Sequence, residues 1–257
     1  MNHTITCPIC ESLASPAFRT SNGDVLRCRS KNCGHFFAGD RNQERGVCDY
    51  SATPQDFQPE FVIRNNLLID WALSKSIVSQ ESSVLDLGSG TGHVAACFRD
   101  RGFSVACVEP SDAARQVLES RGLKNIPYAK DIPEGEMYDF IYSIEVVEHM
   151  PSPVQTLKEV ALHLSKAGTL FLTTPSALSL MAKISRTRNN SFGVASHLHY
   201  FTPSSLTRCL HFAGLREINR CYLPFMVPDR SLLTRTIARC LHVAGLGGGI
   251  AILARSS

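Results

Sequence analysis

The chain has 257 residues, of which 44% are hydrophobic and 19% charged, and its net charge is +3. These values are typical of an ordinary globular protein, and the length suits one large α/β domain with a small appendage. They do not suit a membrane protein: the most apolar late segment, 236–254, contains Arg239, His242 and four glycines, so it is a poor membrane span.

The N-terminal residues do not resemble an export signal. They are polar, and no apolar run precedes Cys7. Ten cysteines in a chain without such a signal indicate reduced thiols and metal ligation rather than a disulfide framework. We therefore expect a cytoplasmic protein.

Two short-spaced cysteine pairs lie near the N-terminus, Cys7 with Cys10 and Cys28 with Cys33, separated by seventeen residues. Each pair can wrap a tight turn that directs two thiolates at one ion, and four sulfurs complete a tetrahedral zinc site. Fewer than fifty residues bury little core, so the metal would supply folding free energy. The pattern resembles a zinc ribbon over residues 1–48, with His35 as an alternative ligand to Cys33.

The role of this ribbon is open on sequence grounds. Arg27, Arg29 and Lys31 near its second cysteine pair could contact nucleic acid. The alternative is a structural flap beside the active site. The charges of residues 1–50 nearly balance, which favours the flap.

A glycine-rich turn follows the short apolar run 83–87 and precedes a predicted helix that starts at His93. A strand, a turn and a helix of this kind open a parallel α/β sheet, in which ligands bind beyond the carboxyl ends of the strands. Asp86 stands beside the turn. Its carboxylate would repel a pyrophosphate but suits a cofactor with cationic groups and no phosphate, such as S-adenosylmethionine.

A second predicted strand, 105–109, ends in Glu109, which can accept hydrogen bonds from both ribose hydroxyls of a nucleoside. The sequence Asp-x-Gly-x-Gly-x-Gly followed by this glutamate resembles motifs I and II of the class I S-adenosylmethionine-dependent methyltransferases. A glycine turn without a ligand is the alternative.

The segments 138–153 and 168–175 carry a further resemblance. They read Tyr-Asp-Phe-Ile-x-Ser-x-Glu-Val-x-Glu-His-Met-Pro-x-Pro and Gly-Thr-Leu-x-Leu-Thr-Thr-Pro. Together with the glycine turn they resemble, over residues 82–215, the small-molecule methyltransferases that include the ubiquinone O-methyltransferases. The resemblance implies a Rossmann-like, mostly parallel seven-stranded sheet flanked by helices over residues 49–257.

The resemblance also implies a set of cofactor contacts. The loop with Asp131 and Ile132 would hold the adenine amino group, and Ser143 to Glu145 would line the methionine side. The expected S-adenosylmethionine contacts are Asp86, Gly88, Ser89, Gly90, Gly92, Glu109, Asp131, Ile132, Ser143 and Glu145.

The remaining pattern predicts flanking elements. Helices are expected at 58–73, 112–120, 151–164 and 204–213, and strands at 125–131, 138–145, 169–174, 215–222 and 249–255. The last two strands would form an antiparallel pair at the sheet edge, with 224–248 as substrate cover.

Two histidines are candidates for a general base. By the resemblance His149 enters the active site. The segment with His197 and His199 is similar to a Tyr-His-Glu-His segment in sugar C-methyltransferases that also carry a zinc ribbon. This chain keeps both histidines but has Ser196 and Leu198 at the other two positions. Helix-entry histidines bonded to backbone are the alternative, and for His197 we favour it.

We thus expect a methyltransferase that acts on a hydroxyl or an acidic carbon of a small biosynthetic molecule, with His149 or His199 as the base. The small molecule could be a sugar or another polar, acidic intermediate. Residues 183–257 hold ten Lys or Arg against two Asp or Glu. We favour a solvated basic surface as the reason for this surplus; the alternative is a substrate with an acidic part, such as a phosphate or carboxylate. The alternatives are an RNA base methyltransferase and a non-catalytic S-adenosylmethionine-binding regulator. No pattern indicates the oligomeric state.

Overall fold

The computed structural model describes residues 5–40, 59–180, 182, 190–223 and 247–257. The basic loop residues 183–188 and most of the expected substrate cover, 224–246, lie outside the described residues, as does the expected domain boundary at residue 48. No helix in the described ranges is long and apolar enough to cross a membrane.

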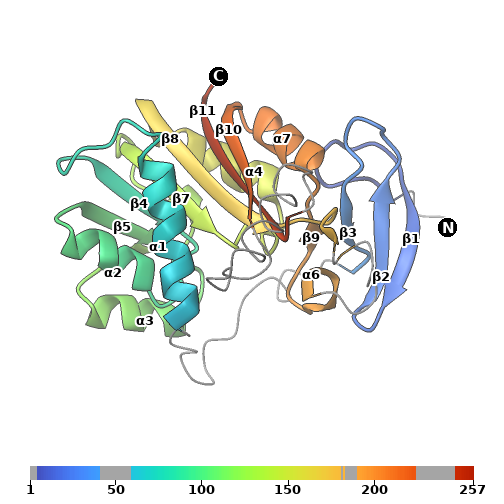
Figure 1. The fold of residues 1–257 in the computed structure, drawn as a ribbon, viewed down its shortest axis with the longest axis horizontal. Coiled ribbons are helices and arrows are strands. Elements are labelled where there is room, and N and C mark those ends of the chain that lie inside the picture. The colour runs from blue at the N-terminus through green and yellow to red at the C-terminus, as the bar shows by residue number, and fades with distance from the viewer. Residues whose placement is uncertain (1–4, 41–58, 181, 183–189, 224–246) are drawn as a thin grey trace, which may run out of the picture.

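The larger of two sheets has seven strands in the order β10-β11-β8-β7-β4-β5-β6 (Figure 1). Strand β11 runs antiparallel to both of its neighbours, and the other adjacent pairs are parallel. This confirms the predicted fold class and the pairing of the last two strands. The strands are β4 Ser83–Leu87, β5 Ser104–Val108, β6 Lys124–Ile126, β7 Tyr138–Ile144, β8 Leu164–Pro175, β10 Leu215–Leu223 and β11 Gly249–Ser256.

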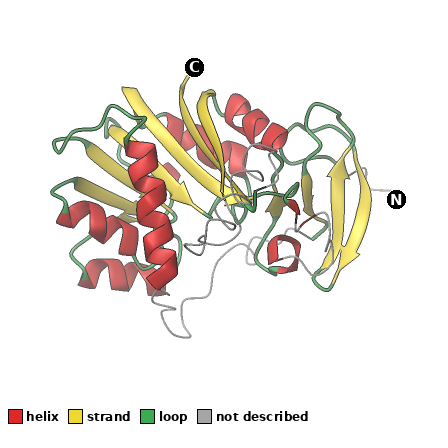
Figure 2. Ribbon diagram, in the orientation of Figure 1, coloured by secondary structure: helices red, strands yellow, loops and turns green. Residues whose placement is uncertain are grey.

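Helices cover both faces of this sheet (Figure 2). On one face, apolar side chains of α1 and α2 pack on Phe140 and Phe171, and on the other, α4 and α7 pack on Leu170 and Leu172. A sheet buried on both faces needs apolar residues at consecutive positions, which is why β4 reads as an apolar run. The helices are α1 Pro59–Leu73, α2 His93–Asp100, α3 Asp112–Ser120, α4 Pro153–Ala161 and α7 Pro203–Phe212.

Three predicted elements differ from their expected bounds by three residues or more at one end. The helix expected to reach Leu164 ends at Ala161, because Leu164 pairs with Tyr138 and starts β8 several residues before the expected strand. The strand expected over 125–131 is only Lys124–Ile126. It ends at Pro127, which has no N–H to donate to a ladder, and a short 3₁₀ helix η2, Ala129–Asp131, follows.

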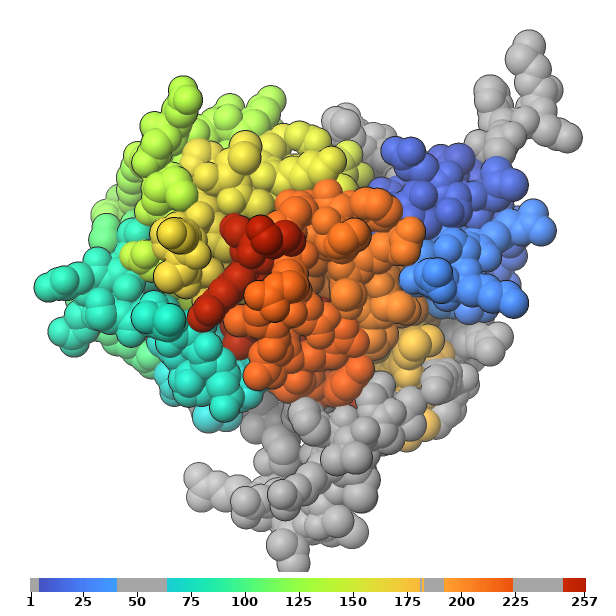
Figure 3. All heavy atoms as spheres, turned by 90° about the horizontal axis from the view of Figure 1, so that it is seen from above, coloured from blue at the N-terminus to red at the C-terminus, as the bar shows by residue number. Residues whose placement is uncertain are grey.

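The smaller sheet has the order β1-β2-β3-β9. Strands β1 Ala14–Thr20, β2 Gly23–Cys28 and β3 Phe36–Ala38 come from the N-terminal cysteine region, whereas β9, His199–Tyr200, comes from the segment before α7. Figure 3 shows the blue N-terminal region lying against the orange surface of 190–223. One buried cluster contains both Phe37 of β3 and Leu206 of α7, so the two parts share a core.

Candidate active site

The glycine-rich turn after β4 requires two of its glycines. Gly88 and Gly92 have φ of 81° and 79°, a region that disfavours side chains. A Cβ on Gly88 would lie 2.4 Å from Val146 Cγ1, and one on Gly92 would lie 2.3 Å from Leu118 Cδ2. The turn therefore packs directly against the loop after β7 and against α3. Gly90 also has positive φ, at 54°, and the Ser89 hydroxyl donates to the Asp86 carbonyl at 2.8 Å.

Asp86 lies at the wall of a cavity of about 190 Å³ between α1, the turn and the end of β7. The residue is 4% exposed, and burial raises the pKa of its carboxyl to about 7. Two further buried oxygens lie in the same wall: Asn65 Oδ1 has no hydrogen-bond partner among the described residues, and the Tyr142 hydroxyl interacts with the Asp86 carboxyl. Three oxygens that can accept hydrogen bonds thus surround one cavity, which suits a ligand with a cationic N–H group.

Glu109 follows β5 and holds the glycine turn in place. Its two carboxylate oxygens accept backbone N–H groups of Gly90 at 2.8 Å and Ser111 at 2.9 Å. Burial raises the pKa of this carboxyl. Because a carboxylate has about four acceptor sites, both oxygens keep a lone pair for ribose hydroxyls.

A second cavity, of about 310 Å³, adjoins the first, since Gly88 and Val146 line both. Its far wall is formed by Tyr128, Ala129 and Lys130. Asp131 and Ile132 follow these residues directly. The Asp131 side chain is exposed and Ile132 is buried, and neither is among the residues that line the cavity.

The end of β7 brings Glu145 to the first cavity's border, whereas Ser143 is not among the residues that line either of the two cavities. Ser143 is buried, and its hydroxyl donates to the Leu87 carbonyl at 2.9 Å, which ties β7 to β4. Glu145 lines the cavity with φ of 56°, a strained value for a residue with a side chain. Its Oε1 accepts from Thr173 Oγ1 at 3.0 Å and from Arg64 at 3.3 Å.

His149 lines the second cavity. Its Nδ1 is 3.0 Å from the carbonyl oxygen of Ser196. Because a carbonyl only accepts, the neutral ring carries its proton on Nδ1 and leaves a lone pair on Nε2. Burial lowers the pKa of this imidazole, so the ring is neutral near pH 7 and able to take a proton.

Two side chains next to His149 were not predicted as site residues. Glu148 Oε1 lies 4.0 Å from His149 Nε2, and the His197 ring packs edge-on to His149 with centroids 4.7 Å apart. Donor atoms of all three lie within 4.8 Å of one another, so the group could also hold a cation. Burial raises the pKa of Glu148 well above its usual range. Because glutamate is rarely fully buried, the sequence predicts an exposed Glu148. Only its position next to His149 could have indicated that it belongs to the site.

His199, the second candidate base, lies in β9 and is fully buried. Its Nε2 donates to the Met150 carbonyl at 2.9 Å, and its Nδ1 is 3.1 Å from His35 Nε2. It is not among the residues that line either of the two cavities. His35, the alternative metal ligand, is thereby bonded to His199 and to Ser205.

The four N-terminal cysteines come together as predicted from their spacing. Cys7 and Cys33 sulfurs are 3.9 Å apart, those of Cys10 and Cys28 are 3.5 Å apart, and all four fall within 4.8 Å of one another. Four thiols at these distances fit the donor set of a tetrahedral zinc ion.

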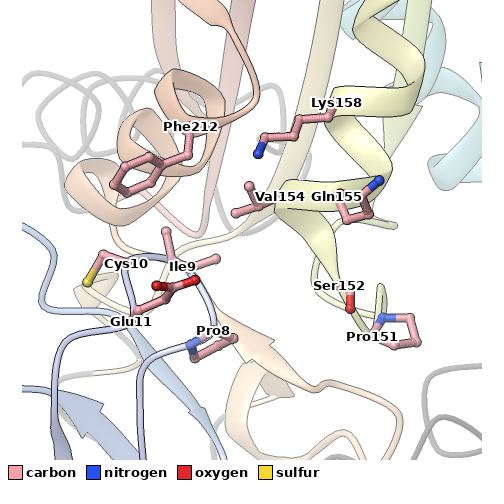
Figure 4. A pocket seen from close by; sticks show the side chains of 10 residues that line it. All are labelled: Pro8, Ile9, Cys10, Glu11, Pro151, Ser152, Val154, Gln155, Lys158 and Phe212. Atoms are coloured by element: carbon pink, nitrogen blue, oxygen red, sulfur yellow. The ribbon is translucent and has the colours of Figure 1, made fainter.

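A third cavity, of about 490 Å³, lies between the first cysteine pair and helices α4 and α7. Figure 4 shows Ile9 and Val154 on its two sides, with the Lys158 amino group pointing inward. None of the predicted cofactor residues lines it. The two adjoining cavities at the glycine turn are therefore the better candidate site.

Known proteins resemble this chain over the same region. The family model for a methyltransferase domain matches residues 63–219. The C-methyltransferase NovU of Streptomyces niveus is 26% identical over 161 residues, which is 59% of this chain and 37% of that protein. A ubiquinone biosynthesis O-methyltransferase of Saccharophagus degradans is also 26% identical over 161 residues, covering 56% of this chain and 68% of that protein.

Solved structures agree on the fold. An S-adenosylmethionine-dependent methyltransferase of Thermotoga maritima superposes with a TM-score of 0.57 at 19% identity, over 77% of this chain and 92% of that chain. Coclaurine N-methyltransferase bound to S-adenosylhomocysteine superposes with a TM-score of 0.53 at 18% identity, over 83% and 78% of the two chains. With the family match over more than half its length, the chain belongs to the methyltransferase-domain family, among the class I S-adenosylmethionine-dependent methyltransferases.

Proposed function

We propose that this protein transfers a methyl group from S-adenosylmethionine to a hydroxyl or an acidic carbon of a small biosynthetic molecule, with His149 as general base. The observation that carries the proposal is the pair of adjoining cavities at the glycine turn, one walled by Asp86 and the other by His149. The similar C- and O-methyltransferases support small-molecule chemistry.

The residues of the first cavity fit the amino-acid end of the cofactor. Asp86, Asn65 and Tyr142 offer acceptors to its ammonium group, and Asn65 Oδ1 has no hydrogen-bond partner among the described residues. Glu109 would hold the ribose. The adenine would enter the second cavity beside Ala129, with Asp131 and Ile132 next to it as the resemblance implies, and Ser89, Gly90, Gly92, Ser143 and Glu145 would complete the contacts.

When bound, S-adenosylmethionine supplies an activated sulfonium methyl and leaves as S-adenosylhomocysteine. The chain's own residues then have to align the acceptor, exclude water and take one proton. His149 Nε2 has the required lone pair, since its Nδ1–H is donated to Ser196. Glu148 Oε1, 4.0 Å away, is placed to interact with the imidazolium that forms.

The test is His149→Gln, because glutamine can keep a donor to the Ser196 carbonyl without offering a base. We expect kcat to fall by about 10²- to 10⁴-fold, with the dissociation constant for S-adenosylmethionine changed by less than about 3-fold. Methyl transfer from labelled cofactor to candidate hydroxyl acceptors measures the first quantity, and calorimetry measures the second.

Two controls sharpen the comparison. His211→Gln, at an exposed position of α7, should leave both quantities unchanged. Because burial lowers the His149 pKa, the wild-type kcat should stay high as the pH falls to 6.5 and decline only below it. Equal losses of turnover and cofactor affinity in His149→Gln would refute the base assignment.

We also infer that Cys7, Cys10, Cys28 and Cys33 bind a structural zinc ion. Their mutual distances support this inference.

The alternative function, methylation of an RNA base, finds less support. The Arg27 guanidinium, one of the ribbon's candidate contacts, lies over the Phe36 ring at 5.1 Å and contributes to packing.

A further inference from the structure

Three consecutive residues around the candidate base are bonded to one short segment. Glu148 accepts through its carbonyl from the N–H groups of Leu198 and His199, at 2.9 and 3.0 Å. His149 bonds the Ser196 carbonyl, and the Met150 carbonyl accepts from His199. The position of the His149 ring therefore depends on segment 196–199.

The cysteine region holds that same segment from the other side. Strand β9 pairs with β3, and the Ala38 N–H donates to the Leu198 carbonyl at 2.9 Å. Thr202 Oγ1 lies 3.5 Å from the carbonyl of Cys33, one of the candidate zinc ligands. Segment 196–202 is thus fixed between the second cysteine pair and the loop after β7.

Two buried histidines join these contacts, and their protons can be assigned. His199 Nε2 faces a carbonyl, so it carries the hydrogen and His199 Nδ1 accepts. His35 Nε2 must then donate to that Nδ1, which leaves the lone pair of His35 Nδ1 facing the Ser205 hydroxyl at 3.2 Å, a hydroxyl that also lies 3.1 Å from the Thr202 carbonyl. The order His35, His199, Met150 gives one consistent direction of hydrogen bonds in which both rings are neutral.

We propose that His35 and His199 are positioning residues through which the N-terminal cysteine region orients His149 for proton transfer. The inference rests on the proposed function, in which His149 is the base. It assigns the cysteine region a task in catalysis, and it gives the buried His35–His199 pair a function.

The test compares His199→Phe with His199→Gln, and His35→Phe with His35→Gln. Phenylalanine keeps a planar ring but removes the hydrogen bonds, whereas glutamine can restore a donor toward Met150 or His199. We expect the Phe variants to lower kcat by about 10- to 100-fold, with S-adenosylmethionine affinity and metal content per chain unchanged. The Gln variants should recover most of the lost kcat, and His211→Gln serves as the neutral control.

Hydrogen exchange separates this inference from the proposed function. In the Phe variants, the amides of 146–150 should exchange faster while those of β4 and β5 stay protected, whether or not an acceptor is known. If wild-type protein transfers no methyl group, the proposed function fails, and exchange alone decides the positioning. Unchanged kcat and exchange, or parallel loss of kcat, cofactor affinity and metal, would overturn the inference.

Discussion

Asp86 carries a cost in the free protein that a cationic ligand would relieve. Burial raises its pKa from the ordinary value of 3.8 to about 7, so the folded state keeps a proton that the unfolded chain loses. The free energy of unfolding therefore falls as the pH rises from about 4 to 7, because the unfolded state binds fewer protons in this window. A carboxylate placed at such a cost is typical of a functional site.

Asp86→Asn should remove this pH dependence, because asparagine cannot ionise. We expect the variant to exceed the wild type in stability by about 1–3 kcal/mol at pH 8, and by clearly less at pH 5. Thermal unfolding of both proteins at the two pH values measures the difference. Glu109, whose pKa burial also raises, is present in both proteins, and its repulsion of the Asp86 carboxylate is part of the pH dependence that the substitution removes. A gap of the same size at both pH values would contradict the assignment.

At the scale of elements, the glycine turn is held between β4, α3 and the loop after β7. Gly88 and Gly102 both have positive φ, 81° and 92°, but only Gly88 faces a neighbour: a Cβ at Gly102 meets nothing within 4 Å. The pair therefore separates backbone strain from steric conflict.

We expect Gly102→Ala to cost about 1 kcal/mol of stability through its backbone alone, and Gly88→Ala to cost about 2–4 kcal/mol, since its Cβ also displaces Val146. Val146 lines both cavities, so only Gly88→Ala should weaken S-adenosylmethionine binding. Denaturant unfolding and calorimetry check the two effects. Equal costs in the two variants would show that Val146 does not restrict the turn.

Elements with local patterns could be predicted from the sequence. The β4 run, its glycines and the acid after β5 lie within thirty residues, and the open α/β sheet follows from them. Strand β9 could not be predicted in the same way. It has only two residues, and it pairs with β3 more than 160 residues away, so no periodicity marks it.

At the scale of the whole molecule, the chain forms one structure from two parts with a common core. Cys33, Phe37, Met150 and Leu206 belong to one buried cluster, so the four-cysteine region and the methyltransferase sheet stabilise each other. Spacing alone predicted the four cysteines together, because each pair is local. The burial of His199 against His35 depends on how the two parts pack. The sequence could therefore not decide whether His199 is a general base or a histidine bonded to backbone groups.

We propose above all that the cavity walled by Asp86 and its neighbouring cavity hold a phosphate-free cationic cofactor. Calorimetry of the metal-loaded protein with S-adenosylmethionine, and with a nicotinamide dinucleotide for comparison, provides the decisive test. We predict micromolar or tighter binding of S-adenosylmethionine at pH 8, at least about 10-fold weaker binding in Asp86→Asn, and no detectable dinucleotide binding. Tight dinucleotide binding without any affinity for S-adenosylmethionine would contradict the account.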